Sequence, residues 1–184
     1  MLIYASPLFA QAEEECKSYV LPNVKLYERT AARERYEPGY ETMREVVRKR
    51  LATLEPTPLT PDDLFEPGVL DKLILKSGGV MRTLIGLVHD ACTEAELRDL
   101  DTVNAESAQE AVNTRAAQLS YRLDTKRLKE LQHVYENHRM SGEAVSDELL
   151  HGLLIAAYRN GTAWFDVHPL LWDELPGRNK EPGS

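Results

Sequence analysis

Apolar residues recur at helical spacing along most of the chain, and this periodicity predicts a mainly helical fold. Within residues 39–54, one stripe contains Met43, Val46, Val47, Leu51 and Leu54. The same spacing predicts further helices over residues 69–76, 80–95, 102–120, 124–139 and 141–150. Thr60 followed by Pro61 is typical of a helix start, and Asn104 is a suitable N-cap.

The pattern changes near the C-terminus, where two short strand-like runs cover residues 154–158 and 163–167. Asn160-Gly161 lies between them, and this dipeptide is a strong signal for a β-hairpin turn. The chain is therefore predicted to be mainly α (α+β), with a helical bundle followed by a winged-helix-like helix pair and a C-terminal hairpin.

Composition and charge favour a globular protein and argue against nucleic acid as a partner. Hydrophobic residues make up 42% of the chain, and the formal net charge is −8. Arg44, Arg48, Lys49 and Arg50 alternate with apolar positions, as on the solvated face of a helix. If the C-terminal module bound DNA, its recognition segment would be residues 141–152, which contain acidic residues and no Lys or Arg.

No segment has the length and apolarity of a membrane span, and the N-terminus lacks the basic stretch of a signal peptide. Cys16 and Cys92 match no zinc or redox spacing. We therefore expect a cytoplasmic protein without membrane association. The polar, Gly- and Pro-containing end, residues 176–184, is expected to be disordered.

Several kinds of catalytic motif are missing from the sequence. There is no G-x-x-x-x-G-K-[ST] phosphate loop, no H-E-x-x-H and no G-x-S-x-G. His133 and His138 are five residues apart, a spacing that does not suit a metal pair on one helix face. We predict no catalytic residue, no metal site and no cofactor held by this chain alone.

One local motif remains, the segment Ser77-Gly78-Gly79-Val80-Met81-Arg82. The glycines can end one helix, and Ser77 can cap the next, whose free N–H groups would attract an anion. Arg82 falls in the first turn, where its guanidinium could reach a phosphate. An ordinary capped helix with a surface arginine is the alternative, and local physics alone favours that alternative.

Five segments follow one another in a recognisable order: residues 20–25, 36–39, 44–50, 77–82 and 164–170, the last being Trp164-Phe165-Asp166-Val167-His168-Pro169-Leu170. This order, which extends along nearly the whole chain, resembles the C-terminal half of bacterial AAA-type P-loop ATPases. The resemblance implies that residues 1–35 are an edge of the ATPase core, 36–101 the helical lid and 102–175 a winged-helix-like module. Residues 176–184 would be the tail.

The resemblance also implies roles for the motif. Arg82 resembles the sensor-2 arginine, which contacts the terminal phosphates of ATP, and Ser77, Gly78 and Gly79 would shape the turn that presents it. Residues 2–7 would be the last core strand, with Ser6 near the sensor-1 position. ATP and Mg would bind a nucleotide-binding core outside this chain, and that core would be its partner.

The alternative is a self-contained protein–protein interaction module, such as an adaptor or assembly subunit, with no nucleotide role. Its partner would meet the aromatic hairpin residues Tyr158, Trp164 and Phe165, or a second copy would bury the N-terminal apolar segment in a homo-oligomer. The ATPase interpretation instead predicts an exposed apolar patch around Leu2, Ile3 and residues 20–26, where the core would dock.

Overall fold

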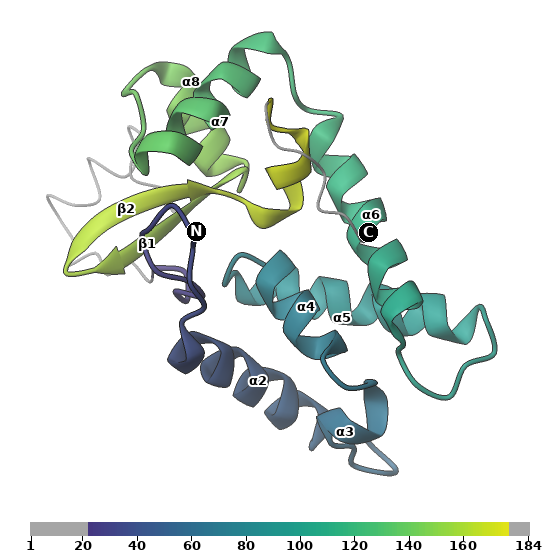
Figure 1. Ribbon diagram of the computed structural model, residues 1–184. Coiled ribbons are helices and arrows are strands. Elements are labelled where there is room, and N and C mark those ends of the chain that lie inside the picture. The colour runs from purple at the N-terminus through teal and green to yellow at the C-terminus, as the bar shows by residue number, and fades with distance from the viewer. Residues whose placement is uncertain (1–21, 177–184) are drawn as a thin grey trace, which may run out of the picture.

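The computed structural model describes residues 22–176, and it confirms a mainly helical fold with a C-terminal antiparallel hairpin (Figure 1). The calls on Leu2, Ile3, Ser6, Cys16 and residues 177–184 lie outside the described residues. In chain order the elements are α2 (Glu37–Leu51), α3 (Pro61–Leu64), α4 (Val69–Lys76), α5 (Met81–Glu96), α6 (Ala105–Ser120), α7 (Thr125–Asn137), α8 (Ala144–His151), β1 (Ile155–Asn160), β2 (Thr162–Val167) and the 3-10 helix η1 (Pro169–Glu174).

Helix starts follow the capping residues of the sequence. Asn104 Oδ1 accepts hydrogen bonds from the backbone N–H groups of Glu106 (3.1 Å) and Ser107 (2.9 Å) at the start of α6. Asp124 Oδ1 accepts one from Arg127 N (2.8 Å) at the start of α7. Thr60 precedes α3, whose first residue is Pro61. The side chains of Asn104 and Asp124 satisfy N–H groups that have no partner within the helix.

The first helix ends earlier than the apolar stripe predicts. α2 stops at Leu51, so Leu54 lies in the following loop with 44% of its surface exposed. Pro56 and Pro58 follow closely, and each disfavours helical backbone in the residue before it. At the other boundary, α2 begins two residues before the predicted start, because Pro38 suits the first turn of a helix.

The hairpin pairs Ile155 with Val167 at its open end and Asn160 with Thr162 at its tip. Gly161 therefore stands alone at the tip, with a φ of +78° that favours glycine. Helices α7 and α8 pack against this hairpin (Figure 1). The order of two helices and a hairpin is that of a winged-helix-like module.

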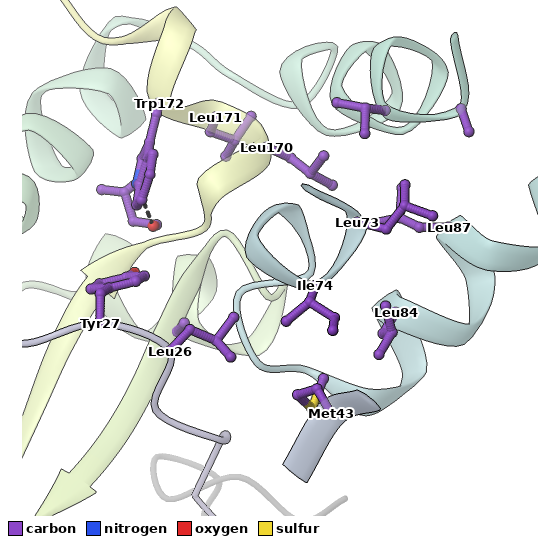
Figure 2. Packing of buried hydrophobic residues seen from close by; sticks show 14 of the residues in the cluster. Leu26, Tyr27, Met43, Leu73, Ile74, Leu84, Leu87, Leu170, Leu171 and Trp172 are labelled. Carbon is purple, nitrogen blue, oxygen red and sulfur yellow. Dashed lines mark hydrogen bonds between the residues drawn. The ribbon is translucent and has the colours of Figure 1, made fainter. Parts of the chain in front are cut away.

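One continuous hydrophobic core runs through the described chain, from Leu26 to Leu175. Helices α2, α4 and α5 enclose Met43, Ile74 and Leu84, and Leu170 and Leu171 of η1 join this layer from the hairpin side (Figure 2). Helix α6 packs along α5 and also contacts η1 (Figure 1). The helical bundle and the hairpin module therefore share buried side chains.

The segment before α2 is packed into this core. Leu26 and Tyr27 are each 1% exposed, and Figure 2 shows Tyr27 next to Trp172 of η1 and Leu26 extending toward Ile74 of α4. Asn23 N donates to Ala157 O (3.1 Å), so the segment is also held to β1 by its backbone. The predicted exposed patch is therefore wrong at Leu26, because this side chain is part of the chain's own hydrophobic core.

Candidate functional site

The Ser77-Gly78-Gly79 turn joins α4 to α5, and both glycines adopt left-handed backbone, with φ of +61° and +71°. Ser77 is fully buried; its Oγ donates to Ile74 O (2.6 Å) and accepts from Gly79 N (3.2 Å). Ser77 therefore closes α4. The prediction that it caps α5 is wrong, since Val80 holds the N-cap position without a side-chain hydrogen bond.

The backbone N–H groups of the turn are used within the turn itself. Gly78 N donates to Leu75 O (3.0 Å), and Val80 N donates to Ser77 O (3.1 Å). With Gly79 N bound to Ser77 Oγ, the turn offers no free N–H to an anion. Ser77, Gly78 and Gly79 thus build the turn and do not themselves form a phosphate cradle.

Two distant segments close over the glycines. Val24 N donates to Gly79 O (3.0 Å), and the Tyr158 hydroxyl donates to Gly78 O (2.8 Å). A Cβ added at Gly79 would lie 1.8 Å from Val24 O. One added at Gly78 would lie 2.9 Å from Pro169 Cδ. Glycine is therefore required at both positions by close approach as well as by backbone conformation.

Arg82 is the second residue of α5, and its side chain is exposed. Within residues 22–176 its guanidinium makes no hydrogen bond or ion pair. The first turn of α5 also contains no acidic residue, so a positive charge lies unopposed at the positive end of the helix dipole. Met81 beside it is 49% exposed. Within residues 22–176, this end of α5 thus has an exposed arginine, an N-cap residue without a side-chain hydrogen bond and no acidic residue in its first turn.

A buried ion pair that the sequence did not indicate joins Arg33 to Asp166 of β2. Residues 28–35 are almost entirely charged or small, as is typical of a surface loop, yet the Arg33 side chain is only 8% exposed and Asp166 is fully buried. Arg33 Nε donates to Asp166 Oδ2 (2.8 Å), and Nη2 donates to Asp166 Oδ1 (3.0 Å). The guanidinium stacks on Tyr135, 3.8 Å from the ring centroid.

The surroundings of this ion pair shift the pKa values of Arg33 and of the neighbouring His138. Burial alone would lower the pKa of Arg33, but the hydrogen bonds and charge of Asp166 outweigh it, so the Arg33 pKa is raised. His138 Nδ1 lies 3.8 Å from Asp166 Oδ2, yet burial lowers the pKa of His138 below its ordinary value. The two hydrogen bonds of this pair therefore connect residues 28–35 to β2.

The aromatic hairpin residues proposed to meet a partner are mostly internal. Tyr158 and Trp164 are 1% and 3% exposed and stack with ring centroids 4.5 Å apart. Phe165 is half-buried against the same core. The prediction of an aromatic partner surface on the hairpin is therefore wrong for Tyr158 and Trp164, which fill the space between the hairpin and Tyr27.

The described residues, 22–176, contain no cluster of three or more His, Cys, Asp or Glu placed to hold a metal ion. In the same part of the chain, no helix is long and apolar enough to cross a membrane. Comparison with models of protein families, with curated proteins and with solved structures finds no significant match to this chain.

Proposed function

We propose that this chain is the non-catalytic lid and winged-helix-like portion of an AAA-type ATPase. In this proposal Arg82 is the sensor-2-like residue, and ATP and Mg bind a core outside these 184 residues. The observation that carries the proposal is the free guanidinium of Arg82 at the start of α5, without a counter-charge in the described chain. The polyphosphate of ATP would supply that counter-charge.

The surroundings of Arg82 support this assignment. The glycine turn three residues earlier is fixed by Val24 and by Tyr158, so the start of α5 is held in one orientation. The first described residues also lie beside this turn, because Val24 N donates to Gly79 O and Asn23 N donates to Ala157 O. A core joined there would meet the end of α5 that carries Arg82.

The test uses the complete reading frame that contains these residues, assayed for ATP hydrolysis as wild type and as Arg82→Ala. We expect kcat to fall by about tenfold or more, because a charge that contacts the transferring phosphoryl group stabilises the transition state. Arg82→Lys should retain part of the activity, since it keeps the charge but loses the planar fork of donors.

Arg50→Ala is the matched control, because Arg50 is an exposed arginine at the far end of α2. It should leave kcat unchanged. The proposal fails if the purified protein neither binds nor hydrolyses ATP, or if Arg82→Ala is as active as wild type.

A second candidate is the self-contained interaction module, and the burial of Leu26 and Tyr27 favours it. These residues fill the chain's own core and leave no apolar surface at their positions for a separate ATPase domain. This alternative requires that Mg-ATP and Mg-ADP leave the melting temperature of the complete protein unchanged, because a ligand that binds the folded state would raise it.

A further inference from the structure

Residues of α3, the C-terminus of α5 and the loop that leads to α6 line a groove. Figure 1 shows where these elements lie in the fold. The volume of the groove is about 430 Å³. The floor is apolar, built from Leu64, Cys92, Ala95, Leu100 and Val103. Backbone hydrogen bonds from Val103 N to Leu64 O (2.8 Å) and from Glu66 N to Val103 O (3.0 Å) fix the two loops that form it.

Two leucines in the segment that follows α5 face solvent, and one of them, Leu100, lines the groove. Leu97 is 74% exposed and Leu100 is 38% exposed, although large apolar side chains are normally covered. They are three residues apart, Leu97 at the C-cap of α5 and Leu100 in the loop that follows. Leu100 therefore extends the apolar floor to the surface, and Leu97 adds a second exposed apolar side chain in the same segment; exposed apolar side chains that gather in this way mark a protein contact.

The rim of the groove is acidic. Glu96, Asp99 and Asp101 are exposed and form no ion pair within residues 22–176. Arg98, the basic residue among them, pairs with Glu106 at 2.5 Å. The neighbouring stretch 52–70, which includes α3, contains four acidic residues and no Lys or Arg. The chemistry that complements this surface is apolar and positively charged.

We propose that this groove binds an amphipathic helix of a protein partner, with leucine-like side chains on one face and Lys or Arg beside them. The apolar face of the helix would cover Leu97, Leu100 and the floor, and its cations would meet Glu96, Asp99 and Asp101. This is the helix-in-groove mode of recognition. The proposal is independent of Arg82, which lies at the opposite end of α5.

The probe is a fluorescein-labelled 18-residue helical peptide of Leu and Lys, titrated with the complete protein by fluorescence anisotropy at about 0.15 M salt. A peptide of the same length made of Leu and Glu is the reference. We expect saturable binding of the Lys peptide alone. Leu97→Ser with Leu100→Ser should weaken it by about tenfold or more, the effect of losing a well-buried apolar side chain.

The peptide could be attracted by the net negative charge of the protein without binding in the groove. Two variants that each remove three negative charges, one at the rim and one elsewhere, distinguish these cases. The first is Glu96→Gln/Asp99→Asn/Asp101→Asn, in the rim. The second is Glu136→Gln/Glu143→Gln/Glu148→Gln, on exposed positions of α7, α8 and the loop between them. We expect the rim variant to bind the Lys peptide at least about tenfold more weakly than the control variant, since exposed charges act over roughly one Debye length.

Circular dichroism and light scattering accompany each titration, so that misfolding or self-association is seen directly. The proposal is overturned if the two charge variants bind alike, if the double leucine variant binds as wild type, or if no saturable binding occurs. It is also overturned if the protein self-associates through Leu97 and Leu100 and the Lys peptide does not compete, because the occupant would then be a second copy.

Discussion

The hydroxyl of Tyr158, in the hairpin, donates a 2.8 Å hydrogen bond to the carbonyl oxygen of Gly78, in the turn before α5. The two residues are 80 positions apart and both are buried. Tyr27 stands next to them, with its hydroxyl 3.3 Å from that of Tyr158. A single hydroxyl thus connects three segments: the chain before α2, the glycine turn and β1.

Removal of this hydroxyl should be costly. Tyr158→Phe leaves Gly78 O without its donor in a buried site, and we expect the free energy of unfolding to fall by about 1–3 kcal/mol. Tyr121→Phe is the control, because Tyr121 is 94% exposed. Urea denaturation should show a change within about 0.5 kcal/mol for the control. An equal effect of the two variants would contradict the role of the bond.

The close approach at Gly79 predicts a large difference between two glycines of similar φ. Gly79→Ala places a Cβ 1.8 Å from Val24 O, whereas Gly68→Ala meets nothing within 4 Å. Both must adopt left-handed backbone, which costs an alanine about 1 kcal/mol. Thermal or urea unfolding should therefore show a drop of roughly 1 kcal/mol for Gly68→Ala and several times that for Gly79→Ala. Comparable losses would mean that Val24 moves away freely.

Breaking the Arg33–Asp166 pair on one side should destabilise the fold more than removing both charges. Asp166→Asn leaves a poorly exposed guanidinium without its counter-ion, and we expect a loss of about 3 kcal/mol. Adding Arg33→Met removes that uncompensated charge and should recover part of the loss. Urea titrations of the two single variants and the double variant measure the coupling. Strict additivity would show that the ion pair contributes nothing.

The folded state should become less stable below neutral pH because His168 is buried in its neutral form. Burial lowers the pKa of His168 to about 4, and its Nδ1 accepts a hydrogen bond from Leu170 N (3.3 Å). The unfolded chain takes up this proton near pH 6.5 but the folded chain does not, so stability is fully present above about pH 6.5 and falls as the pH drops towards 4.

The size of this effect follows from the shift. We expect His168 to account for about 2 kcal/mol of stability lost between about pH 7.5 and pH 5. His168→Asn retains a hydrogen-bond acceptor but cannot titrate in this range, so its stability should depend less on pH by that amount. Unfolding curves of wild type and His168→Asn at both pH values measure how much the free energy of unfolding of each protein changes with pH. Parallel pH profiles would rule out His168 as the source.

The charge on Arg82 should oppose folding of the isolated chain. Arg82→Gln removes a cation from the positive end of α5 and should raise the free energy of unfolding by about 0.3–1 kcal/mol. Arg50→Gln makes the same charge change in the last turn of α2, where a cation is favourable, and should lower it slightly. Thermal melts at low salt compare them, and the same sign for both would exclude the dipole explanation.

The sequence predicts the helices of this fold well because periodic apolar residues and side-chain caps act locally. α4 occupies the predicted residues 69–76, and Asn104 and Asp124 cap α6 and α7 as their residue types suggest. The prediction that the first helix extends to Leu54 is wrong, because Pro56 and Pro58 follow and disfavour helical backbone in this segment. The apolar stripe alone does not contain that information.

The candidate site is only partly predictable, since much of it depends on distant segments. Arg82 is exposed at a helix start, as expected from its spacing after the glycines. Val24, which bonds to Gly79, lies more than 50 residues before it in the chain. Asp166, the partner of Arg33, lies more than 130 residues after it. Arg33 resembled a loop residue because its neighbours are charged. The interaction that buries it has no local sequence signal.

Helix α6 has a mechanical consequence for the assembled molecule. It packs along α5 and reaches η1, and Ser120 Oγ at its end donates to Glu174 Oε1 (2.9 Å). The core continues across residues 101–102, where the resemblance sets the boundary between lid and winged-helix-like module. Movement of α5 relative to the hairpin would therefore require the buried contacts of α6 with α5 and η1 to rearrange.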